Sequence, residues 1–177
     1  TDTSRLASSE SAFWCGFQFQ NIPVGRTVKQ TIVSDEGFFF GECDLEQAET
    51  RDTAYITGDE NLIAAVNSPR DFHSLNVSAF FGMPYESIYD AIRKKTLNKP
   101  LRDVGKRVNH GANYNMGPDV LVDTMGLERI YEAGRLLKLN PRCTAREIAQ
   151  YLLDRFDATY PVIRGDYHRY IKQCIAT

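Results

Sequence analysis

The segment 38–51, FFFGECDLEQAETR, holds the first residues whose types and spacing suggest chemistry. Its apolar start predicts a buried strand that ends at Asp44. A carboxylate at a strand end is exposed but rigidly held, so Asp44 and the backbone carbonyl of Leu45 can bind Mg²⁺. The alternative is that Asp44 is a helix N-cap and Glu49 a solvated residue in the first turn. This segment alone leaves both interpretations open.

A second candidate is the segment 100–117, PLRDVGKRVNHGANYNMG. Four side chains recur there at every fourth position and form one stripe along a predicted helix: Arg102, Lys106, His110 and Tyr114. The stripe changes from cationic to aromatic, which suits a triphosphate at one end and a sugar and base at the other. Val104, Val108 and Ala112 give the same helix a face for packing. Spacing alone is equally compatible with an amphipathic helix whose polar side faces water.

Charge is unevenly distributed, although the formal net charge is only -2. Carboxylates dominate residues 35–60 and can collect metal ions, whereas bases dominate residues 93–107 and can hold phosphates. Two solvated faces would explain the same pattern. His73 lies between the two segments, and a lone histidine is more often structural than functional.

The composition is that of a globular protein, and 177 residues suit one domain. Four cysteines without a CxxC pair argue against a zinc site or a disulfide framework and fit a reducing compartment. No stretch of about 18 apolar residues occurs. We therefore expect a soluble, cytoplasmic protein without a membrane partner. The chain begins at Thr1 without methionine, which suggests that the start of a parent protein is absent.

Local signals predict a small strand pair that carries a large helical lobe. The strands are expected at 31–33 and 38–44, joined by a turn at 35–37. Helices are expected at 46–57, 59–66, from Ser68-Pro69 onward, 84–97, 100–114, 118–125, 144–156 and from Pro161 to the C-terminus.

These segments together resemble the family A DNA polymerases. DLEQAETR at 44–51 is similar to the family's DYSQIELR motif, and GDENLIAAV at 58–66 and RDFHS at 70–74 continue it in register. RDVGKRVNHGANYNMG at 102–117 resembles the R-x-x-x-K-x-x-x-F/Y-G-x-x-Y-G helix. TDTSRLAS at 1–8 and QNIPVG at 20–25 resemble the segments that precede the metal-binding aspartate. The motifs occur in the family's order over nearly the whole chain.

The resemblance assigns roles that the residue types only permit. Asp44 matches the palm aspartate that binds two catalytic Mg²⁺ ions, with Leu45 as a carbonyl ligand. Glu49 matches the steric-gate glutamate that excludes ribonucleotides by crowding the sugar 2′ position. Asp44 and Lys106 are the implied catalytic residues. The residues implied in binding the deoxynucleoside triphosphate are Gln47, Glu49, His73, Arg102, Lys106, His110 and Tyr114.

Three further residues match positions that contact primer–template DNA, namely Arg5, Gln20 and Asn21. The sequence also departs from the family pattern. His110 stands where the family usually has Phe or Tyr against the nucleotide sugar, and its protonation near neutral pH would add a cation there. Asn115 replaces a glycine after the tyrosine. Leu45 replaces a tyrosine, which matters little for a carbonyl ligand.

The implied fold is α+β and mainly helical, a partial palm sheet carrying a helical fingers subdomain. We expect a partial palm over residues 1–45, fingers over 46–160 and a helix returning toward the palm over 161–177. The His-Asp-Glu segment with the second palm carboxylate is not in the sequence. We therefore expect a catalytic-core fragment that is inactive alone and is completed by further polymerase segments or a complementary chain.

Two rival functions remain at this point. One is a single-subunit RNA polymerase relative, which Glu49 opposes because a glutamate gate would block the ribose hydroxyl. The other is a non-catalytic helical module that binds nucleotide or nucleic acid through its basic stripe.

Overall fold

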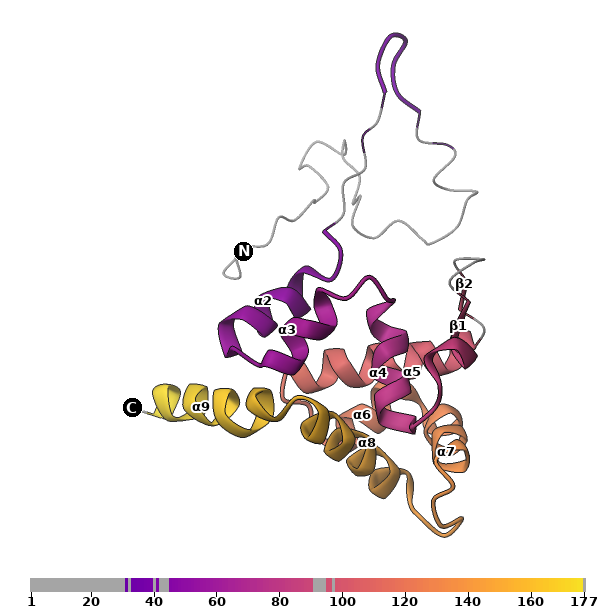
Figure 1. Cartoon of the computed structure of the whole chain (residues 1–177), viewed down its shortest axis with the longest axis vertical. Coiled ribbons are helices and arrows are strands. Elements are labelled where there is room, and N and C mark those ends of the chain that lie inside the picture. The colour runs from indigo at the N-terminus through magenta and orange to yellow at the C-terminus, as the bar shows by residue number, and fades with distance from the viewer. Residues whose placement is uncertain are drawn as a thin grey trace, which may run out of the picture. The chain divides into compact units, whose positions relative to one another are not determined.

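The computed structural model describes residues 31, 33–39, 41, 45–90, 95–96 and 98–176. The chain divides into two units, Thr1–Asp44 and Leu45–Thr177, and the described helices all belong to the second. The mainly helical class is confirmed (Figure 1). Four residues with predicted roles lie outside the described residues, namely Arg5, Gln20, Asn21 and Asp44.

The second unit is built from short helices joined by tight connections. The α-helices are α2 (Ala48–Thr57), α3 (Glu60–Val66), α4 (Phe72–Phe81), α5 (Lys99–Asn113), α6 (Pro118–Met125), α7 (Leu127–Leu136), α8 (Ala145–Thr159) and α9 (His168–Ala176). A 3₁₀ turn, η2, covers Tyr85–Ser87, and a π-helical turn, η3, covers Ile163–Tyr167. No helix in the described part of the chain is long and apolar enough to cross a membrane.

Side-chain caps start several of the predicted helices. The Asp59 carboxylate accepts from the Leu62 N–H at the start of α3. Thr144 and Glu147 form the predicted capping box at the start of α8. The Asn98 side chain caps α5, with Pro100 in the first turn. Helix α6 has the predicted bounds and ends at Gly126.

Two predicted helical segments are wrong. Ser68-Pro69 does not start α4, because Asp71 caps that helix three residues later. Residues 84–97 are not a helix: η2 is followed by strand β1 (Tyr89–Asp90), which pairs antiparallel with β2 (Lys95–Thr96). Ile88 and Tyr89 favour extended backbone, which explains why the helix does not continue past η2.

The predicted palm sheet is not confirmed in the described residues. Between 31 and 45 these show only a turn, in which the Phe38 N–H donates to the Asp35 carbonyl. Gly37 has a φ of 84°, which glycine adopts without strain. The turn predicted at 35–37 is therefore present, but no strand flanks it among the described positions. The only strands in the described part are β1 and β2, in another segment.

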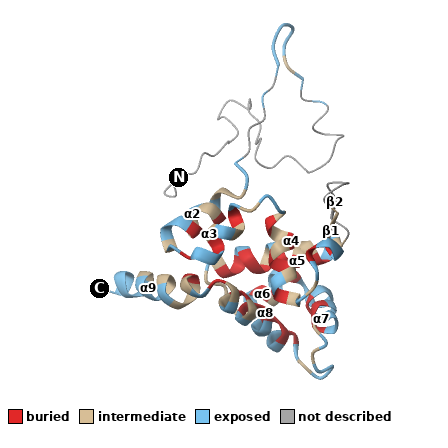
Figure 2. Cartoon of the chain, in the orientation of Figure 1, coloured by how far each residue is buried: buried red, intermediate tan, exposed pale blue. Residues whose placement is uncertain are grey.

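The buried core lies mainly between α5, α8 and the helices around them (Figure 2). The predicted packing face of α5 is confirmed, since Val104, Val108 and Ala112 are all buried. Helix α4 packs closely along α5 at Gly105, where an added Cβ would lie 2.7 Å from Val77 Cγ2 and 2.8 Å from the His73 carbonyl oxygen. The absence of a side chain at Gly105 thus sets the distance between the two helices.

Candidate nucleotide-binding site

A pocket of about 280 Å³ opens between the start of α2, the first turn of α4 and the middle of α5. Its lining residues are Leu45, Gln47, Ala48, Glu49, Thr50, His73, Lys106, Asn109 and His110. Six of these nine carry a predicted role, although they come from three segments of the sequence. A second pocket of about 480 Å³, between α7 and the start of α8, contains none of the predicted residues.

The stripe along α5 forms the basic wall of the first pocket. Lys106 is exposed and has no ion pair among the described residues. One turn later, His110 Nδ1 lies 3.7 Å from Glu49 Oε2, so the predicted gate and the predicted sugar contact lie side by side. The His110 and Tyr114 rings are 5.0 Å apart. Arg102 on α5 and Tyr114, the C-cap of α5, do not line the pocket.

Helix α2 begins with unusual backbone geometry, and its first residues line the pocket. Gln47 precedes the helix in the left-handed region, with a φ of 56°. Glu49 and Thr50 follow in the first turn and both line the pocket. The buried Asn109 side chain on α5 donates to Thr50 Oγ1 at 3.1 Å. This hydrogen bond fixes the helix that carries Glu49 against the helix that carries Lys106.

Sequence reasoning missed Asn109 and Thr50. The signal was an asparagine beside the apolar positions of α5, where a polar side chain needs a partner once it is buried. Nothing in the sequence indicated which residue that partner would be, because Thr50 is 59 positions away.

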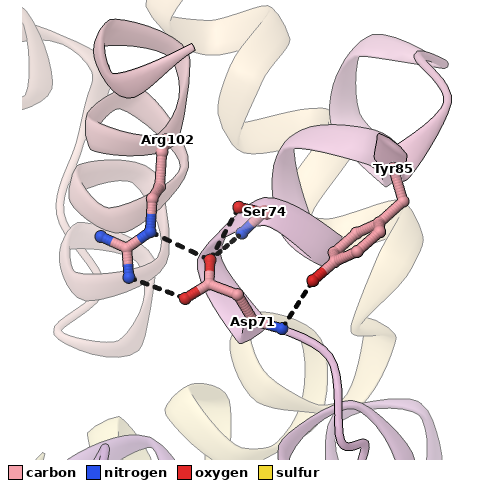
Figure 3. Close-up of polar contacts among 4 residues, drawn as sticks. All are labelled: Asp71, Ser74, Tyr85 and Arg102. Atoms are coloured by element: carbon pink, nitrogen blue, oxygen red, sulfur yellow. Dashed lines mark hydrogen bonds and ion pairs between the residues drawn. The ribbon is translucent and has the colours of Figure 1, made fainter. Parts of the chain in front are cut away.

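Arg102 is held by a carboxylate that the sequence analysis did not identify. Its Nε donates to Asp71 Oδ2 at 3.0 Å and its Nη2 to Asp71 Oδ1 at 2.8 Å (Figure 3). Burial alone would raise the pKa of Asp71, but the hydrogen bonds from Arg102 and Ser74 outweigh it and lower the pKa. The same hydrogen bond raises the pKa of Arg102, so the pair is ionised over the whole physiological range.

His73 is neutral at physiological pH. Burial, followed by the positive charge of Arg102, lowers the pKa of His73 to about 4. Its Nδ1 atom is buried and has no hydrogen-bond partner among the described residues. A neutral imidazole carries one N–H donor, so His73 can hydrogen-bond a phosphate oxygen without adding charge.

Three residues of the pocket have a buried polar atom that lacks a partner in the part of the chain that the structure describes. These atoms are Gln47 Oε1, His73 Nδ1 and Asn109 Oδ1. Buried polar atoms are nearly always satisfied in folded proteins, and exceptions gather where a ligand or functional group is expected. Their presence around one cavity distinguishes it from the second pocket, whose lining contributes none of the unpartnered atoms.

The described residues do not by themselves form a metal site. They contain no group of three or more His, Cys, Asp or Glu side chains arranged around a common point. Leu45 is exposed, and Asp44 falls outside the described residues. The predicted Mg²⁺ ligands thus gain no support from the donor set of the pocket.

Comparison with known proteins links this geometry to one family. The sequence profile of DNA polymerase family A matches residues 1–177. The chain is 30% identical to DNA polymerase I of Chloroflexus aurantiacus over 177 residues, which cover 98% of this chain and 15% of that protein. It is 28% identical to the thermostable DNA polymerase I of Thermus aquaticus over 169 residues, 93% of this chain and 16% of the relative. The chain therefore spans about one sixth of the length of these relatives.

Proposed function

Because the chain belongs to DNA polymerase family A, we propose that it supplies the nucleotide-binding part of a DNA-directed DNA polymerase. In this proposal the pocket between α2, α4 and α5 takes the incoming deoxynucleoside triphosphate. The enzyme joins the deoxynucleotide to a primer 3′ end on a DNA template and releases pyrophosphate during DNA replication. The cytoplasm is its expected location.

One observation carries the proposal. Residues matched to nucleotide contacts in three separate motifs line one cavity, together with three polar atoms that have no partner among the described residues. Lys106 offers the cation that a phosphate requires, and neutral His73 offers a hydrogen bond beside it. An amphipathic helix with a merely solvated face would not require residues of α2 and α4 at the same place.

The part of the pocket next to Glu49 and His110 suits a sugar. Glu49 and His110 form a pair there, and the His110 ring contacts the Tyr114 ring at an interplanar angle of 58°. We propose that the Glu49 carboxylate crowds the 2′ position and so favours deoxyribose, and that Gln47 supports this wall. Tyr114 is more than half exposed, which suits a residue that meets the base pair and the template.

The remaining parts of the proposal concern groups that the described residues do not place. Asp44 and the Leu45 carbonyl would hold Mg²⁺ with carboxylates from elsewhere in the polymerase, and the metal would neutralise charge on the transferring phosphate. Arg5, Gln20 and Asn21 would contact primer–template DNA. Residues 1–45 would belong to the palm, 46–160 to the fingers, and 161–177 would return toward the palm.

The test is the removal of Lys106, the pocket cation that has no ion pair within the described part of the chain. In a polymerase that contains this chain, Lys106→Ala should raise the dissociation constant for the correct deoxynucleotide by at least about tenfold, because a charged phosphate contact is worth roughly 1.5–3 kcal/mol. Titration of the enzyme–primer–template complex would measure it. Arg129→Ala, which removes an exposed cation on α7, is the matched control. Equal affinities of the Lys106→Ala variant and the wild type would refute the assignment of the pocket.

A further inference from the structure

We propose that Asp71 is a positioning residue for nucleotide binding, and that it acts by fixing the edge of the Arg102 guanidinium that faces the triphosphate. The inference rests on the proposed function. Asp71 lies in the motif RDFHS, of which the sequence analysis used only His73.

The contact between the two side chains is bidentate. The Asp71 carboxylate accepts hydrogen bonds from the Nε–H and from one N–H of Nη2 of Arg102 (Figure 3). A guanidinium has five N–H groups in one plane, so the pair leaves Nη1 and the second N–H of Nη2 for another anion. Arg102 therefore has one defined free edge instead of a freely rotating fork.

Asp71 can orient Arg102 because Asp71 is itself held from several directions. It is the N-cap of α4, and its Oδ2 accepts from both the N–H and the hydroxyl of Ser74. Its own N–H donates to the hydroxyl of the buried Tyr85, at 2.9 Å. The Tyr85 ring in turn lies beneath the Arg70 guanidinium, 5.0 Å from the ring centroid. The start of α4 is thereby tied to η2.

The ion pair with Asp71 also gives Arg102 and Lys106, the two cations of the stripe, different roles. Asp71 cancels the charge of Arg102, whereas Lys106 has no ion pair among the described residues. Lys106 then supplies net positive charge to the pocket, and Arg102 supplies directed hydrogen bonds. The function of Asp71 is geometric and is exerted entirely through Arg102.

A different role would give Asp71 the opposite effect. If the carboxylate were a latch that competes with phosphate for Arg102, its removal would strengthen nucleotide binding. The geometry opposes this role, because the pair leaves Nη1 of Arg102 available, so a phosphate can bind Arg102 without displacing Asp71. Removal of the Asp71 carboxylate should raise the dissociation constant for the nucleotide if Asp71 positions Arg102, and should lower it if Asp71 is a latch.

The experiment uses Asp71→Asn in a polymerase that contains this chain. Asparagine keeps the helix cap and the side-chain volume but cannot accept both guanidinium hydrogen bonds as a carboxylate does. We expect the dissociation constant for the correct deoxynucleotide to rise about tenfold, with little change in the single-turnover rate at saturating nucleotide. Asp119→Asn is the control, because it removes the carboxylate of an exposed aspartate–arginine pair that does not line the pocket, and it should leave the dissociation constant unchanged.

A double-mutant cycle shows whether Asp71 acts through Arg102. Asp71→Asn should have almost no effect when Arg102→Lys is already present, because the bidentate fork is then gone. Additive effects, unchanged affinity or tighter binding in Asp71→Asn would each overturn the inference. If the wild type bound no deoxynucleotide, the proposed function itself would fail, and the two failures are thus distinguishable.

Folding is checked separately. Thermal melts of Asp71→Asn should match the wild type within a few degrees. If that variant fails to fold, Asp71→Ser is the second variant, since serine is also a good N-cap and lacks a carboxylate. It should give the same loss of affinity, and retention of wild-type affinity would overturn the inference.

Discussion

At the scale of single residues, Lys106 and His73 line the pocket, and the Arg102–Asp71 ion pair lies beyond one end of its lining. Lys106 supplies the net charge, His73 is kept neutral by burial, and Arg102 is paired with Asp71. Lys106, His73 and Arg102 thus differ in charge and in how firmly neighbouring groups hold them. The difference arises from their partners, not from their residue types.

The neutral state of His73 predicts a pH dependence of stability. The pKa is about 4 in the folded chain against an ordinary value of 6.5, so the unfolded chain binds a proton that the folded chain excludes. The stabilisation that comes from neutral His73 is fully present above pH 6.5 and is lost as the pH falls toward 4. The free energy of unfolding of the wild type, measured with urea, should therefore decrease as the pH is lowered from 6.5 to 4.

The comparison variant for this measurement is His73→Asn, which cannot titrate. The carboxyl groups of the chain also titrate in acid, but they are common to both proteins. The difference in free energy of unfolding between wild type and variant should therefore change between pH 4 and 6.5. A constant difference would contradict a lowered pKa for His73.

At the scale of elements, the close packing of α4 and α5 brings His73 next to Lys106. This packing depends on Gly105, whose missing side chain leaves room for Val77 and for the backbone of α4. Two helices with an ordinary side chain at this position would be held further apart. Gly105 in the middle of α5 thus allows the close helix contact that brings His73 and Lys106 together.

Gly105→Ala should therefore destabilise the chain. Its Cβ would overlap a side chain and a backbone oxygen, which costs about 1–3 kcal/mol, against about 1 kcal/mol gained in helix propensity. Gly165→Ala is the matched control, because nothing lies within 4 Å of a Cβ there. Urea denaturation of both variants would measure the effect. If Gly105→Ala were as stable as Gly165→Ala, the close contact would not determine the packing.

The sequence predicted those elements whose signals are local. Helices α5, α6 and α8 start at prolines or caps that lie inside the predicted segments. Prediction failed at 84–97, where η2 is held by the contact of Tyr85 with Asp71, 14 residues away. Helix α7 was not predicted, because it lacks a side-chain cap at its start.

In the candidate site, too, the sequence predicted what depends on local spacing and missed what depends on contacts between distant segments. The stripe on α5 follows from a spacing of four and was predicted as one face. Asp71 and Thr50 were missed as partners of α5, because their contacts join positions 31 and 59 residues apart. A pattern within one helix cannot reveal a side chain on another element. The metal and DNA contacts remain predictions.

At the scale of the whole molecule, the main buried cluster runs from Ala54 to Ile163 and lies within the second unit. Residues 45–177 expressed alone should accordingly unfold in one cooperative transition. Circular dichroism during urea titration would measure this. Leu152→Ala in the same chain should lower the free energy of unfolding by about 2–5 kcal/mol, since Leu152 is fully buried in the cluster. A gradual, non-cooperative transition of residues 45–177 would contradict this assignment.

The pairing of Asp71 with Arg102 has a kinetic consequence. Seen from a distance, the two opposite charges cancel, and screening at physiological ionic strength reduces what remains within about 8 Å. An approaching anion is therefore steered by Lys106 and meets the Arg102 donors only after contact. Under the proposed function, Lys106 would govern how often a nucleotide arrives, and Arg102 would govern how long it stays bound.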